Sequence, residues 1–221
     1  MINLYDYIMS LTKLLQDKFG KRLVYVGLQG SYFRGEATEN SDIDIMVVID
    51  HLTVSDLDEY RTIIKALPFS EKSCGFICSR DDLVKWNPLE ICNLLHTTKD
   101  YFGTLTDLVP NYTKTDICHF VKMSVNNLYH AICHQYVHAE SDRDIVTLSE
   151  AYKSVFFILQ NLYCLKTDRF VLTKAELLTL LDGKDFEVLK RSMELKEKIS
   201  CDFSESFALI FSWCQEKIQE I

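Results

Sequence analysis

Two aspartates separated by one residue carry the strongest chemical signal in the sequence. Asp42 and Asp44 follow a turn at Gly30 and Ser31, and they open an alternating apolar run that predicts a strand. Because strand side chains alternate, both carboxylates point to one side, roughly 6.6 Å apart at about 3.3 Å per residue. Carboxylates placed in this way can share hard divalent cations, and two cations about 3.5–4 Å apart stabilise in-line phosphoryl displacement. The spacing therefore predicts a site for nucleotidyl transfer.

The residues around the aspartates predict the turn and the strands that position them. The run 23–28 is short and apolar, and one face of the strand 43–49 is wholly aliphatic. Gly30 permits a sharp turn and a close approach of the backbone to a ligand. Ser31 offers a hydroxyl and a backbone N–H to a phosphate at the start of a helical turn. Ser41 can cap the loop before the aspartates by bonding nearby backbone, which places it beside the nucleotide site.

The alternative is a surface turn whose acids are merely solvated. Asp-x-Asp alone is common, and Gly-Ser alone is equally weak. The two motifs at this spacing, between two apolar strands, favour the phosphate and metal site.

The full motif resembles the signature of a known superfamily. Gly30-Ser31-Tyr32-Phe33-Arg34-Gly35, five residues and then Ser41-Asp42-Ile43-Asp44 resemble the DNA polymerase beta-type nucleotidyltransferases. The form is most similar to their small bacterial branch, which contains aminoglycoside and lincosamide nucleotidyltransferases and the minimal nucleotidyltransferases of toxin–antitoxin pairs. The strong similarity covers about residues 22–50, and a weaker one at 162–174 resembles the helical C-terminal domain of kanamycin nucleotidyltransferase-like enzymes.

The resemblance implies a role for each residue of the motif. Gly30 and Ser31 would hold a nucleoside triphosphate, and Asp42 and Asp44 would bind two Mg²⁺ ions. Arg34 would lie near a phosphate or fix its own loop. The implied reaction moves a nucleoside monophosphate from a nucleoside triphosphate to a hydroxyl group and releases pyrophosphate. The expected donor is ATP, which would transfer AMP, and another nucleoside triphosphate is the alternative donor. The resemblance also implies a homodimer as one option, because related enzymes often form dimers, although nothing in the sequence demands it.

The sequence departs from the superfamily at the third carboxylate. The resemblance places this acid on a following strand, but the expected strand 73–79 contains none. Glu71 lies just before that strand, and Asp81 and Asp82 lie just after it. Glu71 is the expected substitute as general base or metal ligand; alternatively, the second domain supplies the base, or the activity is weak or lost.

These alternatives leave three hypotheses for function. The first is transfer to a hydroxyl of a small molecule that resembles an aminoglycoside. The second is a protein-modifying antitoxin that adds AMP to a tyrosine of a partner toxin. The third is a catalytically impaired module that binds a nucleotide.

The composition limits the classes of partner that the chain is expected to bind. The net charge of −8 disfavours duplex nucleic acid, because non-specific affinity comes from basic residues that neutralise phosphates. The same charge suits a cationic acceptor, or it simply confers solubility. The sequence contains no long apolar segment, so no membrane partner is expected. The eight cysteines lack Cys-x-x-Cys pairing and mostly lie in apolar surroundings, which predicts reduced thiols in a cytoplasmic protein.

Two features of the C-terminal half could also carry chemistry. His130, His134 and His138 recur every four residues on one expected helix, with Cys133 beside them. They could ligate zinc or provide a general base, but a polar helix stripe that faces the cleft or the solvent is the favoured interpretation. Lys153, on the next expected helix, could reach the triphosphate or be a solvated surface residue.

The order of patterns predicts an α+β chain of two domains. Residues 1–105 are expected to form a nucleotidyltransferase fold, with a small mixed sheet and flanking helices. A linker is expected at 100–113, and residues 114–221 are expected to form a helical bundle, which the resemblance implies to be the part that binds the acceptor. The helices of this bundle are expected at 115–139, 143–166, 173–181, 184–198 and 203–219.

Overall fold

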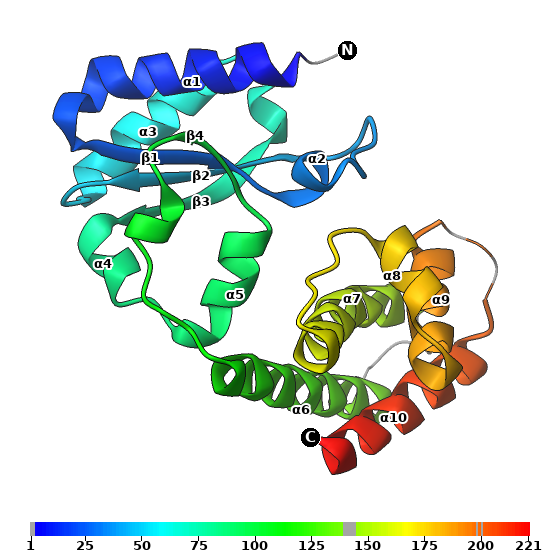
Figure 1. Cartoon of the computed structure of the whole chain (residues 1–221). Helices are drawn as coiled ribbons and strands as arrows, with labels where there is room; N and C mark the ends of the chain where they lie inside the picture. Colours follow the sequence, from blue (N-terminus) through cyan, green and yellow to red (C-terminus); the bar gives the residue numbers. More distant parts are fainter. Residues whose placement is uncertain (1–2, 139–144, 198, 200) are drawn as a thin grey trace. The chain divides into compact units, whose positions relative to one another are not determined.

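The chain forms two compact units, Met1–Asn111 and Tyr112–Ile221 (Figure 1). The structure is a computed structural model, and it describes residues 3–138, 145–197, 199 and 201–221. In these residues the first unit combines a sheet with helices, whereas the second unit contains helices and no strand. The predicted α+β fold with a C-terminal helical region is confirmed.

The sheet of the first unit places the second strand between a parallel and an antiparallel neighbour. The described strands are β1 (Leu23–Leu28), β2 (Ile43–Ile49), β3 (Ser73–Ser79) and β4 (Lys99–Phe102), in the spatial order β3-β2-β1-β4. β1 runs antiparallel to β2 and to β4, and β2 runs parallel to β3. The register sets Leu28 opposite Ile45 and Asp44 beside Cys74. Asp44 therefore lies between the end of β1 and the start of β3.

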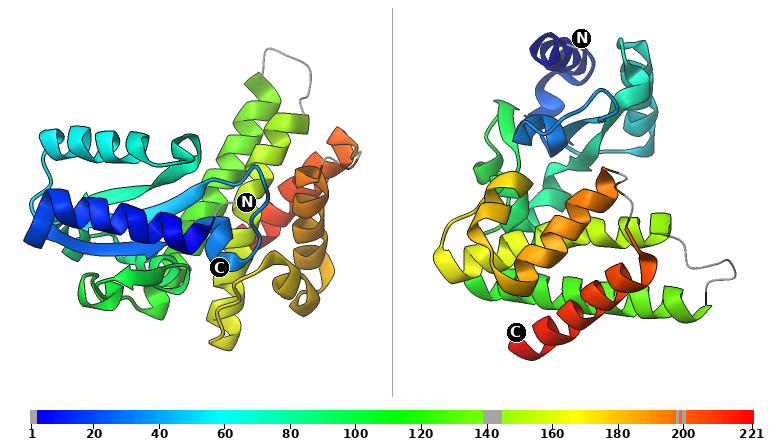
Figure 2. Two further views of the ribbon diagram at one scale, coloured as in Figure 1. Left: turned by 90° about the horizontal axis from the view of Figure 1, so that it is seen from above. Right: turned by 90° about the vertical axis from the view of Figure 1, so that its right-hand side faces the viewer.

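Helices cover both faces of this sheet. The long helices α1 (Leu4–Phe19) and α3 (Val54–Ala66) lie on one face, and the left view of Figure 2 shows them side by side. The short helices α4 (Arg80–Val84) and α5 (Pro88–His96) lie on the other. The aliphatic face of β2 packs in one core with α1, as its alternation predicted, while Met46 and Val48 share a second core with Leu83 and Leu94. Asp44 belongs to the Met46 side of the strand.

Local sequence signals explain where the flanking helices begin. Thr53 caps α3: its hydroxyl accepts a hydrogen bond from the Asp56 backbone N–H, and the Asp56 carboxylate accepts one from the Thr53 N–H. Arg22 adds two bonds to the same carboxylate, at 3.1 and 2.6 Å. Pro88 opens α5, where its missing N–H costs nothing. The first turn of α3 is therefore fixed by a pair that is close in sequence and by one ion pair with the distant Arg22.

The expected linker at 100–113 is partly wrong, because it begins inside a strand. β4 pairs with β1, with Gly27 opposite Asp100 and Val26 opposite Phe102. The Tyr25 hydroxyl donates a hydrogen bond of 2.6 Å to Asp100, which holds this edge strand in place. Four residues with two charges and two aromatics give no alternation that sequence patterns can detect.

The second unit is built from helices around a single core. The described helices are α6 (Lys114–His138), α7 (Ile145–Thr167), α8 (Lys174–Leu180), α9 (Gly183–Lys196) and α10 (Phe203–Glu220). The right view of Figure 2 shows α6 and α7 side by side. These bounds lie within two residues of the predicted ones; the predicted ends at 139, 143 and 198 fall outside the described residues. Trp213 is fully buried in the core and donates a hydrogen bond of 2.7 Å to Asp185.

None of the helices in the described part of the chain is both long enough and apolar enough to cross a membrane.

Candidate active site

The turn after β1 lies directly against the Asp44 carboxylate. The Gln29 backbone N–H donates a hydrogen bond of 2.8 Å to the Asp44 carbonyl oxygen. Gly30 follows with φ of +69° and opens the short helix α2 (Gly30–Arg34). A Cβ atom on Gly30 would lie 1.8 Å from Asp44 Oδ2, so no other residue fits without displacing the carboxylate. The glycine of the motif thus has a steric cause.

The two aspartates differ in their surroundings. Asp42 is exposed just before β2, whereas Asp44 is half-buried within the strand. Burial raises the pKa of Asp44, and the charge of Asp42 raises it further. A hydrogen bond with Cys74 and the charge of Arg34 act in the opposite direction on this pKa. Half-burial beside a second carboxylate makes Asp44 a poor place for an uncompensated negative charge, and a cation would relieve the cost.

The strand that was expected to carry a third acid brings a thiol to Asp44 instead. Cys74 is the β3 residue paired with Asp44, and its side chain is exposed and hydrogen-bonds with that carboxylate. Glu71 lies before β3 in the short 3-10 helix Ser70–Lys72, where its charge acts on the hydroxyl of Tyr7. Among the described interactions, none joins Glu71 to Asp42 or Asp44. Glu71 as the third acid therefore stays a prediction.

The other predicted nucleotide-binding residues shape the loop around α2. Ser31 is half-buried in the first turn of α2, and its carbonyl accepts a hydrogen bond of 2.9 Å from the Glu36 N–H. Arg34 forms an ion pair of 2.9 Å with Glu36 and so fixes its own loop. The Ser41 hydroxyl accepts a hydrogen bond of 2.9 Å from the Thr38 N–H, which caps the loop as predicted.

Lys153 and the histidines lie in the second unit. Lys153 is on α7, exposed, and 2.5 Å from Glu150. His130, His134 and His138 form an exposed row on α6, with ring centroids 6.1 and 4.8 Å apart along it. They line a shallow hollow of about 510 Å³ together with Ala131 and Gln135. In the described residues they form no group of three or more donors arranged to hold a metal ion.

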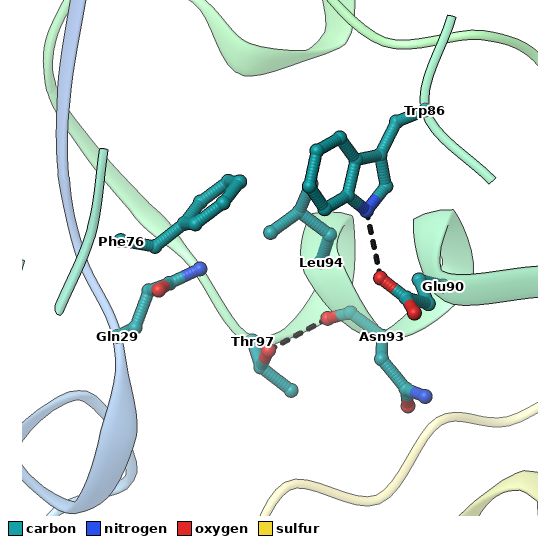
Figure 3. A pocket seen from close by; sticks show the side chains of 7 residues that line it. All are labelled: Gln29, Phe76, Trp86, Glu90, Asn93, Leu94 and Thr97. Carbon is teal, nitrogen blue, oxygen red and sulfur yellow. Dashed lines mark hydrogen bonds between the residues drawn. The ribbon is translucent and has the colours of Figure 1, made fainter. Parts of the chain in front are cut away.

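A cavity of about 310 Å³ lies within the first unit, and sequence reasoning missed it (Figure 3). It is lined by Gln29, Phe76, Trp86, Glu90, Asn93, Leu94 and Thr97. The rings of Phe76 and Trp86 meet edge to face with centroids 5.1 Å apart, and Trp86 Nε1 donates a hydrogen bond of 2.7 Å to Glu90. Its lining comes from four separate segments, so only the tertiary fold brings it together.

The donors around Asp44 fit a hard divalent cation. Asp42 and Asp44 supply carboxylate oxygens, and the absence of a side chain at Gly30 lets the Asp44 carboxylate lie directly against the turn. In the described residues no third acidic, histidine or cysteine side chain completes a metal cluster with them. Mg²⁺ commonly takes one or two carboxylates and completes its shell with waters and substrate phosphates. The residues present therefore suit Mg²⁺ together with a phosphate-bearing substrate.

Comparison with known proteins matches the part of the chain that holds this site. Residues 8–73 match the family described as Nucleotidyltransferase domain. A Methanocaldococcus jannaschii protein named as protein adenylyltransferase MJ1379 is 46% identical over 55 residues, which are 25% of this chain and 53% of that protein. This chain thus spans about half the length of that relative. Protein adenylyltransferase MntA of Thermococcus cleftensis is 36% identical over 78 residues, which are 35% of this chain and 69% of MntA.

A solved structure matches both units in fold. The crystal structure of spectinomycin adenyltransferase AAD(9) from Enterococcus faecialis, with ATP and spectinomycin, superposes with a TM-score of 0.61 at 14% identity. The match covers 98% of this chain and 100% of that one. The motif, the fold of the first unit and the similarity to MntA agree, and the chain belongs to the nucleotidyltransferase domain family.

Proposed function

We propose that the chain is an enzyme that transfers AMP from ATP to a hydroxyl group of an acceptor and releases pyrophosphate. The observation that carries this proposal is the contact between the Gly30 turn and the Asp44 carboxylate. It joins the phosphate-binding half and the cation-binding half of the motif at one point of the fold. Family membership and the adenylyltransferase names of the relatives support the same reaction.

In the proposed reaction, Asp42 and Asp44 hold the Mg²⁺ ions. When bound, Mg²⁺ neutralises charge on the phosphates and on the departing pyrophosphate. Gly30 and Ser31 orient the triphosphate with the backbone and hydroxyl of the first turn of α2, and Arg34 adds positive charge near Asp44. A bond forms between the acceptor oxygen and the α-phosphorus, and the bond from that phosphorus to pyrophosphate breaks.

Fewer observations support the roles proposed for Ser41, Glu71 and Lys153. Ser41 holds the loop that leads into the aspartates. Glu71 is the proposed source of a base for the acceptor hydroxyl, and Lys153 is a proposed contact of the triphosphate. A homodimer and a cytoplasmic location are also proposals; the eight cysteines all lie in the described part of the chain and none forms a disulfide there, which agrees with a reducing compartment.

We propose a small molecule with a hydroxyl group as the acceptor. The support is the fold match to a spectinomycin adenyltransferase, which extends over the second unit as well as the first. The rival acceptor is a hydroxyl group of a partner protein. It is favoured by the names of both curated relatives, whose similarity covers 25% and 35% of this chain.

The experiment that tests the function is a transfer assay. The purified chain is incubated with Mg²⁺, ATP labelled at the α-phosphate, and single acceptors: aminoglycosides, spectinomycin, lincosamides, and the proteins encoded by neighbouring genes. The proposal predicts label on an acceptor and an equal amount of pyrophosphate. Binding of ATP in calorimetry without transfer to any of these acceptors would contradict it and favour the nucleotide-binding module, for which Cys74 in place of an acid beside Asp44 is the support.

A further inference from the structure

The cavity lined by Phe76, Trp86 and Glu90 lies next to the candidate active site. Gln29, in its wall, directly precedes Gly30 and donates its backbone N–H to the Asp44 carbonyl. Phe76 lies two residues after Cys74 on β3 and therefore projects from the same face of the sheet as the Cys74 and Asp44 side chains. A substrate phosphate at Asp44 would have this cavity beside it within the first unit.

The walls of the cavity suit a flat ring. Phe76 and Trp86 present two aromatic surfaces, and Leu94 adds an apolar one (Figure 3). Its volume of about 310 Å³ is at the lower end of the usual range for ligand pockets, which is about 300–1,000 Å³. Bases commonly bind proteins by stacking on aromatic side chains of this kind.

The charge of the cavity restricts which ring fits. Among the described residues that line it, Glu90 has the one ionisable side chain, and no lysine or arginine is present to attract phosphate. Glu90 is exposed to solvent, and Trp86 Nε1 donates a hydrogen bond of 2.7 Å to one oxygen of its carboxylate, as Figure 3 shows. An ionised carboxylate only accepts hydrogen bonds. It therefore pairs with the amino edge of a base and repels a carbonyl edge.

We propose that this cavity binds the nucleobase of the triphosphate and that Glu90 selects a base with an exocyclic amino group. Adenine, whose N6 amino group is a donor, fits this requirement; uracil, which presents the O4 acceptor at the equivalent position, does not. The inference rests on the proposed function, because it assumes that the triphosphate binds at Gly30 and Asp44. It adds the location of the base and the reason for a preference among nucleotides.

Trp86 makes the test specific to this cavity. The chain contains two tryptophans, and the other, Trp213, is fully buried in the second unit. ATP and UTP are titrated with Mg²⁺ into the full chain, with tryptophan emission and calorimetry as the readouts. We expect ATP to quench emission in the wild type but not in Trp86→Phe. We also expect ATP to bind at least about tenfold more tightly than UTP, as one charged hydrogen bond requires.

Glu90→Gln separates selection from stacking. The amide oxygen can still accept the bond from Trp86, but the side chain no longer repels a carbonyl edge. The ratio of ATP to UTP affinity should fall about tenfold in Glu90→Gln and stay unchanged in Glu187→Gln, an exposed glutamate on α9. Circular dichroism shows whether each variant is folded, and the quenching measured in the wild type does not depend on any variant.

Two results would overturn the inference and leave the proposed function intact: ATP that binds without any change at Trp86, or an ATP preference that survives Glu90→Gln. Quenching by an acceptor molecule but not by ATP would likewise overturn it and identify the cavity as an acceptor site. Absence of ATP binding in calorimetry would reject this inference and the proposed function together.

Discussion

The position of the Asp44 carboxylate depends on the absence of a Cβ atom at Gly30. Gly30 and Gly35 have nearly the same positive φ, 69° and 71°, so alanine is strained at either position. Only Gly30 faces Asp44; a Cβ on Gly35 meets nothing within 4 Å. We expect Gly30→Ala to reduce AMP transfer about 100-fold or more and Gly35→Ala to reduce it less than about tenfold. Equal losses in the steady-state rates of the two variants would show that backbone strain, and not contact with Asp44, explains the glycine.

The raised pKa of Asp44 predicts that its ionised carboxylate destabilises the folded chain at neutral pH. The folded chain binds a proton at Asp44 more tightly than the unfolded chain does, so the ionised side chain lowers the free energy of unfolding at neutral pH. This stability returns in full only as the pH falls below the usual carboxyl pKa of about 3.9, because the side chain is then neutral in both states.

Asp44→Asn should therefore raise the Tm of the metal-free chain at pH 7, and the difference from wild type should shrink below about pH 4. Asp107→Asn, at an exposed aspartate of the same unit, controls for the change in net charge. Thermal unfolding followed by circular dichroism in EDTA measures both variants. A lower Tm for Asp44→Asn at pH 7 would contradict the account of Asp44 as a destabilising charge.

Cys74 gives a chemical handle on the same site. Its side chain is exposed, yet partial desolvation, followed by the charge of Asp44, raises the pKa of its thiol, so alkylation is fastest at alkaline pH. We expect iodoacetamide to reduce AMP transfer about tenfold or more, because the added group would lie against Asp44. ATP with Mg²⁺ should protect the enzyme, and Cys74→Ser should resist the reagent. Full activity after stoichiometric modification of Cys74, measured by mass spectrometry, would place this side chain outside the site.

At the scale of elements, α3 is anchored by the cap at its first turn. The Thr53 hydroxyl accepts from the Asp56 N–H and donates to the Asp56 carboxylate. Thr53→Ala should destabilise the first unit by about 1 kcal/mol, the usual cost of losing such a cap, which corresponds to roughly 2–4 °C in Tm. Thr62→Ala, at an exposed mid-helix threonine of α3, is the matched control. Equal effects of the two substitutions on Tm would mean that the cap contributes nothing specific.

Elements with strong local signals could be predicted from the sequence. The alternation in β2, the apolar stripe of α1 and the proline that opens α5 each depend on residues within one element. β4 could not be predicted, because its position depends on pairing with β1 and on the Tyr25 to Asp100 hydrogen bond, seventy-five residues apart. Patterns inside four residues do not contain that information.

The residues of the candidate site likewise divide into those with a local sequence signal and those that depend on contacts distant in sequence. Gly30, Asp42 and Asp44 lie within one short segment, so their spacing alone predicted that they would meet. Cys74 reaches Asp44 through the parallel register of β2 and β3, and the Phe76–Trp86 cavity needs the packing of α5 against the sheet. Both depend on non-local contacts that a single sequence does not reveal.

At the scale of the whole molecule, the chain divides into two compact units. The first unit contains the motif, the aspartates and the cavity, and the family match covers residues 8–73 of it. The second unit has a core of its own, centred on the buried Trp213, and only the fold comparison relates it to an enzyme of known acceptor. Variants in the first unit therefore test which nucleotide binds, whereas tests of the acceptor require the complete chain.

The most direct test of the central claim is AMP transfer by Asp42→Asn and Asp44→Asn. Label from the α-phosphate of ATP is followed onto the acceptor that wild type modifies, in Mg²⁺, with both variants confirmed as folded by circular dichroism. Each substitution removes a cation-binding carboxylate and keeps the side-chain volume, so we expect transfer to fall at least about 1,000-fold in both. Transfer at the wild-type rate by either variant would contradict the claim that these two aspartates hold the cations that make the reaction possible.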